Sequence, residues 1–251
     1  MVSIHEDKLK TMDISFCDKV ATNIVLSDAK QAIVDSLNSL IKDSKFNKKS
    51  GYKYANILTK DTIQYISKQP HLISIKTGGS NYFIYMTKIN GINNCLFIDR
   101  KIKNGYTLPR IISVNYNFDD SIFLGTILDG ELIRDSENNW MFLINNIISY
   151  KGKSCNMGFT AKINLMYKML KTEYNENPEL DICYIRVKKI FNYNDYHNVI
   201  LKYIPSCKYE IKGLYFNTMN NKHSNHLFLF PNKNKINKKT VEPKKIENDL
   251  Q

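Results

Sequence analysis

The stretch SIKTGGSNYFIYMT, residues 74–87, places apolar and polar residues alternately on both sides of a glycine pair. Alternation over short runs rich in Ile, Tyr and Phe predicts two β-strands, and the glycines predict a turn between them. Lys76 stands directly before that turn. The residues alone leave three roles open for it: a nucleophile that takes a nucleotide, a phosphate anchor in a binding pocket, or an ordinary surface lysine.

Composition sets the class of protein and of partner. The chain has 251 residues, of which 43% are hydrophobic, enough for the core of one main domain. Its net charge of +12 favours polyanionic partners such as nucleic acid or nucleotides. The five cysteines are scattered and never spaced as CxxC, so neither a disulfide framework nor a cysteine zinc site is indicated. The excess of Lys, Asn and Ile is typical of an AT-rich genome.

The sequence also predicts where the protein resides. It lacks a run of roughly 18 apolar residues and the apolar core of a secretory signal at its start. We therefore expect an intracellular protein, cytoplasmic or nuclear, without a membrane partner.

Hydrophobic periodicity predicts the order of elements. Helical spacing is present at four segments, residues 28–42, a short stretch from 59, 158–170 and 194–204. Strand patterns occupy residues 71–77, 81–87, 94–100, 121–133, 139–149, 181–191, 207–216 and 226–230. Strands in a run, with helices inserted between the later ones, predict an α+β fold with mainly antiparallel sheets and packed helices.

The predicted organisation has three parts. Residues 1–51 form an N-terminal helical segment, which we expect to cover the core or to bind a partner. Residues 52–230 form the main domain. Residues 231–251 are Lys-rich with little apolar content, and we expect this tail to be disordered because it cannot bury enough surface.

Five short motifs follow one another through the main domain. They are KTGG (residues 76–79), DGEL (129–132), WMFLINNIISYKG (140–152), YIRVKKIF (184–191) and YEIKGLYF (209–216). In this order and spacing they resemble the nucleotidyltransferase domain of mRNA capping guanylyltransferases, and equally the related trimethylguanosine-cap-binding domain of snurportin. The resemblance implies a nucleotidyltransferase (ATP-grasp-like) core. The chain ends without room for the oligonucleotide-binding (OB) fold lid of the capping enzymes, so we expect no such domain.

The resemblance assigns roles to three residues. Lys76 corresponds to the lysine that attacks the α-phosphate of GTP. Glu131 corresponds to the glutamate that approaches the nucleotide ribose and a metal ion, which makes it the candidate metal ligand. Lys188, or its neighbour Lys189, corresponds to the lysine of a later strand.

The sequence departs from the family pattern where the family carries acids. Gly78, Asn145 and Lys212 stand at positions expected for aspartate, and Asn81 replaces an arginine. A divalent ion takes hard oxygen ligands, typically carboxylates. We therefore expect Mg²⁺ or Mn²⁺ as cofactor if the protein is catalytic, and otherwise none.

Binding needs fewer groups than catalysis. A nucleotide requires cations for its phosphates and an apolar or aromatic slot for its base. Gly79, Lys188 and Lys212 are candidate nucleotide-binding residues beside Lys76 and Glu131. Candidate stacking groups are Tyr82, Tyr215 and the sole tryptophan, Trp140, because a methylated guanine is cationic and favours an aromatic face. For Trp140, simple packing beside a turn is the competing interpretation.

Three functions remain open on this basis. The favoured hypothesis is a protein that binds a guanine nucleotide or an mRNA 5′ cap on a catalytically degenerate capping-enzyme fold. The alternative is a divergent mRNA guanylyltransferase that forms a covalent Lys76–GMP intermediate, and the third is a non-specific RNA-binding protein. The implied partners are GTP or capped RNA, with another capping subunit as a further candidate. Large DNA viruses encode capping machinery of this kind, and the composition is compatible with such a source.

Overall fold

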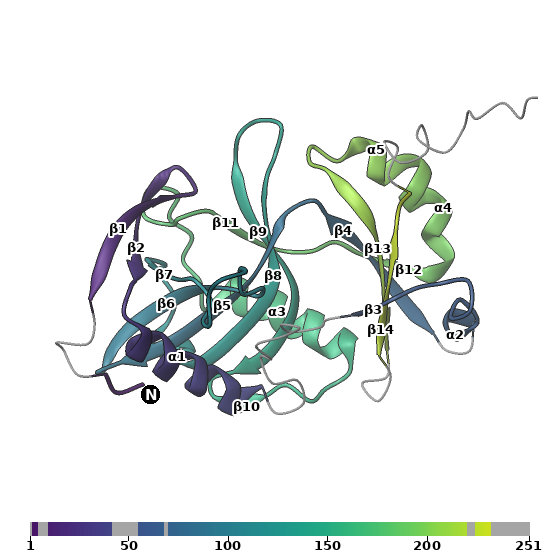
Figure 1. Ribbon diagram of the computed structural model, residues 1–251. Coiled ribbons are helices and arrows are strands. Elements are labelled where there is room, and N and C mark those ends of the chain that lie inside the picture. The colour runs from purple at the N-terminus through teal and green to yellow at the C-terminus, as the bar shows by residue number, and fades with distance from the viewer. Residues whose placement is uncertain (1, 5–9, 42–54, 68–69, 220–223, 232–251) are drawn as a thin grey trace, which may run out of the picture.

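A computed structural model describes residues 2–4, 10–41, 55–67, 70–219 and 224–231 of the chain. These residues form two β-sheets with helices packed on them (Figure 1). Most neighbouring strands run antiparallel, which confirms the expected α+β class. The predicted disordered tail lies outside the described residues, except for Pro231.

The large sheet has nine strands in the described part of the chain. Their order is β1-β2-β7-β6-β5-β8-β9-β10, and β11 adds to β9 as a parallel neighbour. The bounds are β1 (Thr11–Phe16), β2 (Lys19–Ile24), β5 (Ser80–Ile89), β6 (Ile92–Asp99), β7 (Ile111–Val114), β8 (Leu124–Arg134), β9 (Trp140–Tyr150), β10 (Lys153–Ser154) and β11 (Tyr184–Val187).

The small sheet has five strands among the same residues, in the order β12-β4-β13-β14-β3. The bounds are β3 (Ala55–Ile57), β4 (His71–Thr77), β12 (Ile190–Asn192), β13 (Ile211–Thr218) and β14 (Asn225–Leu229). Strand β4, which carries Lys76, is paired on both sides and is therefore held firmly.

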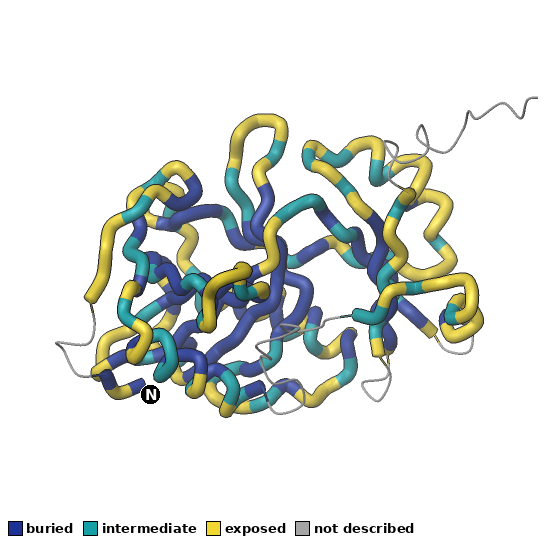
Figure 2. Tube along the Cα trace, in the orientation of Figure 1, coloured by how far each residue is buried: buried dark blue, intermediate teal, exposed yellow. Residues whose placement is uncertain are grey.

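Helices cover both faces of the large sheet. Helix α1 (Ser27–Leu40) buries Ala29, Ile33, Val34 and Leu37, one stripe of an amphipathic helix, against residues such as Phe83 and Leu96. Helix α3 (Phe159–Thr172) buries its own stripe in the core of the opposite face. The strands between them form the dark interior of the molecule in Figure 2.

The small sheet is covered on one face by a continuous helical run. It consists of η3 (Tyr193–Asp195), α4 (Tyr196–Asn198), the π-helical turn η4 (Val199–Tyr203) and α5 (Ile204–Ser206). Val199 packs there on Ile73, Ile75 and Leu214. Two further short helices, α2 (Gln64–Ser67) and η2 (Asp120–Phe123), lie outside this run.

Several elements differ from the sequence-based expectations. The N-terminal segment contains a β-hairpin, β1–β2, which extends the large sheet through β7, in addition to the expected helix. The strand expected over 121–133 begins with the 3₁₀ turn η2, and the strand expected over 181–191 is split into β11 and β12. Strands β3 and β7 were not expected. None of the described helices is long and apolar enough to cross a membrane.

The chain crosses between the sheets where two candidate lysines lie. Strand β4 belongs to the small sheet and β5 to the large one, so Gly78 and Gly79 form a crossing and not the expected hairpin turn. A Cβ at Gly79 would lie 2.3 Å from the backbone oxygen of Leu132, so only glycine lets the crossing lie this close to β8. Residues 188 and 189 form a second crossing, from β11 to β12.

Candidate functional site

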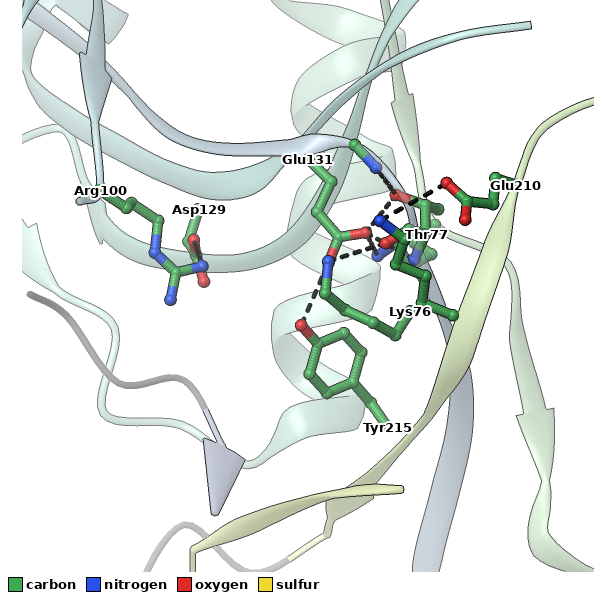
Figure 3. Close-up of polar contacts among 10 residues, drawn as sticks. Lys76, Thr77, Arg100, Asp129, Glu131, Glu210 and Tyr215 are labelled. Atoms are coloured by element: carbon green, nitrogen blue, oxygen red, sulfur yellow. Dashed lines mark hydrogen bonds and ion pairs between the residues drawn. The ribbon is translucent and has the colours of Figure 1, made fainter. Parts of the chain in front are cut away.

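Glu131 lies at the junction of the two sheets. It is on β8, opposite Asn81 of β5 and Leu143 of β9, and it is fully buried. Its Oε1 lies 2.9 Å from Nζ of Lys76, and its Oε2 lies 2.9 Å from Nζ of Lys188 (Figure 3). One carboxylate thus holds the lysines of both crossings.

Neutral donors complete the surroundings of this carboxylate. The backbone N–H and the hydroxyl of Thr77 donate to Oε2 of Glu131 at 2.9 and 2.5 Å. The Tyr215 hydroxyl of β13 donates to Oε1 at 3.1 Å, and the Lys188 ammonium lies 5.4 Å from the centroid of the Tyr215 ring. We call Glu131, Lys76, Thr77, Lys188 and Tyr215 the junction cluster. It joins β4 and β13 of the small sheet to β8 of the large one.

The charge of Glu131 follows from these contacts. Burial acts to raise the pKa of the carboxyl, but the ammonium groups of Lys188 and Lys76 and the Thr77 hydroxyl outweigh it and lower this pKa to about 2. Burial lowers the pKa of Lys188, whereas Glu131 opposes that shift. Glu131 is therefore an anion at neutral pH that compensates two cations.

Lys76 differs from Lys188 in its access to solvent. The Lys76 side chain is 13% exposed, whereas that of Lys188 is 1% exposed. Lys76 Nζ also donates to the backbone oxygen of Thr77 at 2.9 Å. Lys76 is thus the lysine of the cluster that a ligand outside the core can reach.

The structure separates the two lysines that the sequence left as alternatives. Lys188 enters the junction cluster. Nζ of Lys189 lies 5.2 Å from the ring centroid of Phe191 and 4.8 Å from that of Tyr203, over the small sheet and its helical run. Lys188 is therefore the one that faces Lys76 across the carboxylate.

A second buried carboxylate lies two residues before Glu131. Asp129 is fully buried, and its Oδ1 accepts a hydrogen bond of 2.6 Å from Arg100, which follows β6 (Figure 3). Burial raises the pKa of Asp129 to about 6, against the lowering effect of Arg100. No role was expected for this pair from the sequence, although Asp129 belongs to the DGEL motif.

Two of the positions where the resemblance predicts aspartate, Gly78 and Lys212, both lie beside Glu210. Strand β13 pairs with β4 with a register shift between Ile211 and Gly213, so Lys212 lies at a bulge. The backbone N–H of Gly78 donates to the carbonyl of Glu210 at 2.8 Å. The Lys212 ammonium lies 3.5 Å from Oε2 of Glu210, with both side chains exposed. The third such position, Asn145, is buried in β9.

The aromatic candidates divide between two places. Tyr215 is in the junction cluster, as described. Trp140 lies elsewhere: its Nε1 donates to Asp18 at 2.8 Å, its ring lies 5.4 Å from the Arg134 guanidinium, and it lines a pocket of about 250 Å³ with the β1–β2 turn. Tyr82 is buried in the large-sheet core and accepts a hydrogen bond from Arg110. The structure therefore does not bring Trp140 or Tyr82 to Glu131.

The described residues contain no group of three or more His, Cys, Asp or Glu side chains able to hold a metal ion. Glu131, the candidate metal ligand, already contacts two ammonium groups and two hydroxyl groups. Glu210, by contrast, has an exposed carboxylate beside Lys76's strand. Mg²⁺ is commonly held by one or two carboxylates together with substrate phosphates, and Glu210 fits that smaller requirement.

Residues 17–227 match the family described as "mRNA capping enzyme, catalytic domain". The chain belongs to this family. The match covers the β1–β2 turn and α1 as well as both crossings and the junction cluster.

Two solved structures are similar to this chain in shape. A putative ATP-dependent DNA ligase from Aquifex aeolicus is similar over 89% of this chain and 60% of its own, with 10% identity and a TM-score of 0.46. A structure titled "Pmar-Lig_Pre" is similar over 70% of this chain and 46% of its own, with 14% identity and a TM-score of 0.40. The chain thus spans 60% or less of the length of these two proteins.

Proposed function

We propose that this chain is an mRNA guanylyltransferase domain in which Lys76 takes GMP from GTP and passes it to the 5′ end of an RNA. The observation that carries the proposal is the shared carboxylate: the ammonium groups of Lys76 and Lys188 lie on the two oxygens of one buried Glu131. Membership of the capping-enzyme family supports the choice of GTP and RNA as substrates.

The chemistry assigns a task to each group. The Lys76 amine, once it has lost a proton, attacks the α-phosphorus of GTP, a P–N bond forms, and the P–O bond to the β-phosphate breaks to release pyrophosphate. Oε1 of Glu131 and the backbone oxygen of Thr77 each lie 2.9 Å from Lys76 Nζ, so they accept the amine hydrogens and orient the lone pair. Because the pKa of Glu131 is about 2, the proton is passed on to solvent and is not kept by the carboxyl.

Lys188 supplies a fixed positive charge beside the reacting lysine. The Lys188 ammonium is buried and held by Glu131. Because this charge is already in place, the protein needs little rearrangement when negative charge develops on the phosphoryl oxygens. A divalent ion bound with the nucleotide would neutralise phosphate charge and assist the departure of pyrophosphate.

The test is covalent labelling of the full chain with α-labelled GTP and Mg²⁺ or Mn²⁺, followed by denaturation. We expect label on the wild-type protein that pyrophosphate removes, and none on Lys76→Arg. Arginine keeps the charge that holds phosphate, but its guanidinium is always protonated and does not act as a nucleophile. Lys208→Gln serves as a matched control, because it removes an exposed lysine that precedes β13 and leaves the junction cluster intact.

A second function is favoured by one specific observation. Lys212 places an exposed ammonium where the family carries an acid, which suits phosphate binding better than metal binding. In this version the protein binds GTP or a capped RNA end without forming a covalent bond. Two results together would favour the second function. The wild type would bind GTP saturably, with weaker binding by Lys76→Ala, and no covalent label would form on the wild type.

A further inference from the structure

Glu210 occupies the space that a side chain at position 78 would fill. A Cβ built on Gly78 would lie 2.1 Å from Oε2 of Glu210 and 2.9 Å from its Cδ. The carboxylate therefore lies directly over the backbone of the crossing that follows Lys76. Gly78 lacks the side chain, and the residue that precedes β13 supplies a carboxylate at the same place.

The backbone holds Glu210 in this position. Its carbonyl accepts the Gly78 N–H at 2.8 Å, and the next residue, Ile211, pairs with Thr77 in the β13–β4 ladder. The side chain itself is 68% exposed, and its contact with Lys212 is a long one of 3.5 Å between two exposed groups. Exposed pairs of this kind contribute little, so the carboxylate is free to take another partner.

The two buried carboxylates of β8 are already engaged. Glu131 contacts Lys76 and Lys188 and accepts hydrogen bonds from two hydroxyl groups, and Asp129 is held by Arg100. Both are fully buried. Glu210 combines exposure with a position beside the lysine that meets the nucleotide.

We propose that Glu210 is the carboxylate that binds the divalent cation accompanying the phosphates of GTP, in place of the side chain absent at position 78. The inference rests on the proposed function in one respect, that GTP is the nucleotide. A cation held by a single carboxylate and the triphosphate matches the usual mode of Mg²⁺ binding in phosphoryl-transfer sites. The ion's contribution is to neutralise charge on the phosphates.

The experiment measures Mn²⁺ binding to the full chain in the presence of GTP, by the loss of the free Mn²⁺ signal in electron paramagnetic resonance. We expect Glu210→Gln to weaken Mn²⁺ affinity by about tenfold or more, as loss of a group from a metal site commonly does. Glu137→Gln is the matched control, since Glu137 is another exposed glutamate paired with a lysine, Lys208, and should leave the affinity unchanged.

A relocated carboxylate gives the sharper test. Gly78 does not have a left-handed backbone, and shortening the Glu210 side chain removes the two closest contacts of an aspartate there, which leaves the Cβ of residue 210 at 3.1 Å to move by a few tenths of an ångström. We expect Glu210→Ala to lose Mn²⁺ affinity and the double variant Gly78→Asp/Glu210→Ala to recover most of it. Gly78→Asp alone forces the two carboxylates together.

The outcomes separate this inference from the proposed function. If Glu210→Gln binds Mn²⁺ with GTP as the wild type does, or the wild type binds no Mn²⁺ with GTP, the inference is wrong whatever the labelling shows. If Mn²⁺ binding depends on Glu210 but no covalent label forms, the inference stands and the covalent step is wrong.

Discussion

Two regions of strand β8 hold fully buried carboxylates in opposite electrostatic surroundings. Around Asp129, inside the large sheet, one guanidinium faces the carboxyl, and burial raises its pKa to about 6. Around Glu131, at the junction of the sheets, two ammonium groups, two hydroxyls and a backbone N–H surround the carboxyl, and its pKa is lowered to about 2 despite the same burial. Equal burial thus gives opposite shifts, because two ammonium groups lower the pKa of Glu131, whereas the charge of Glu131 adds to burial in raising the pKa of Asp129.

The largest expected effect comes from removing the charge of Glu131. Glu131→Gln leaves Lys188 buried without its counter-ion, and breaking a buried ion pair in this way costs about 3–5 kcal/mol of stability. Urea unfolding at pH 7 measures the loss. Asp129→Asn should cost less, because the remaining amide oxygen still accepts from Arg100 and the carboxyl is only weakly favoured as an anion. An equal or larger loss for Asp129→Asn would contradict the comparison.

The pH dependence of the unfolding free energy tests the two opposite pKa shifts directly. The folded pKa of Asp129 is raised from 3.8 to about 6, so stability falls as the pH rises through this range, by roughly 3 kcal/mol in all. The folded pKa of Glu131 is lowered from 4.5 to about 2, so its contribution of roughly 3 kcal/mol is present above pH 4.5 and is lost as the pH falls toward 2.

Urea unfolding at stepped pH provides the measurement. The difference in unfolding free energy between wild type and Asp129→Asn should change between pH 4 and 6. The difference between wild type and Glu131→Gln should change below pH 4.5. If the unfolding free energies of the wild type and one variant run parallel across this pH range, the carboxyl removed in that variant has an ordinary pKa in the folded protein.

A smaller effect is expected from one hydrogen bond of the junction cluster. Thr77→Val removes the hydroxyl that donates to Glu131 at 2.5 Å and keeps the backbone N–H contact. A hydrogen bond to a charged group contributes about 1.5–3 kcal/mol, which denaturant unfolding detects. The matched control is Thr22→Val, where the hydroxyl lies 3.5 Å from Asp13 at an exposed site and its loss should be nearly neutral.

The smallest effect belongs to an ion pair on the surface. Lys208 and Glu137 are paired, and both side chains are 58% exposed. Lys208→Ala should cost at most about 1 kcal/mol, and added salt should reduce even that. A loss at pH 7 comparable to that of Glu131→Gln would show that burial is not what makes the junction cluster costly to break.

Periodicity predicted most elements of the fold but not the crossings. Apolar alternation identified β4, β5, β6, β9 and β14, and helical spacing identified α1 and α3. The glycine pair after Lys76 was interpreted as a turn because local sequence does not show which sheet a strand joins. The β1–β2 hairpin was missed because its turn consists of Cys17 and Asp18, both with positive φ, where glycine or asparagine is the usual signal.

The candidate site was predicted in part. The order of motifs brought Lys76, Glu131 and Lys188 into one proposed site, and the structure brings these side chains together. Their roles toward a nucleotide stay predictions. The position of Glu210 over Gly78 depends on the register of β13 against β4, and no motif encodes a contact between residues 132 positions apart. Trp140 was a candidate because a cationic methylated guanine favours an aromatic face, a criterion that carries no information on where the side chain lies in the fold.

The pairing of β4 also fixes when the site can form during synthesis. Ser74 pairs with Ile190 and Lys76 with Gly213, so neither neighbour of this strand exists until the ribosome has translated most of the described chain. Such non-local pairing is slow, because the chain loses the entropy of closing long loops before the stabilising contacts form. The large sheet can assemble its β5–β6–β8–β9 centre from neighbouring segments much earlier. Strand β4 is therefore paired on both sides only near the end of folding, and a shortened chain that stops before β13 would lack Tyr215 and one of the two strands that hold Lys76 in place.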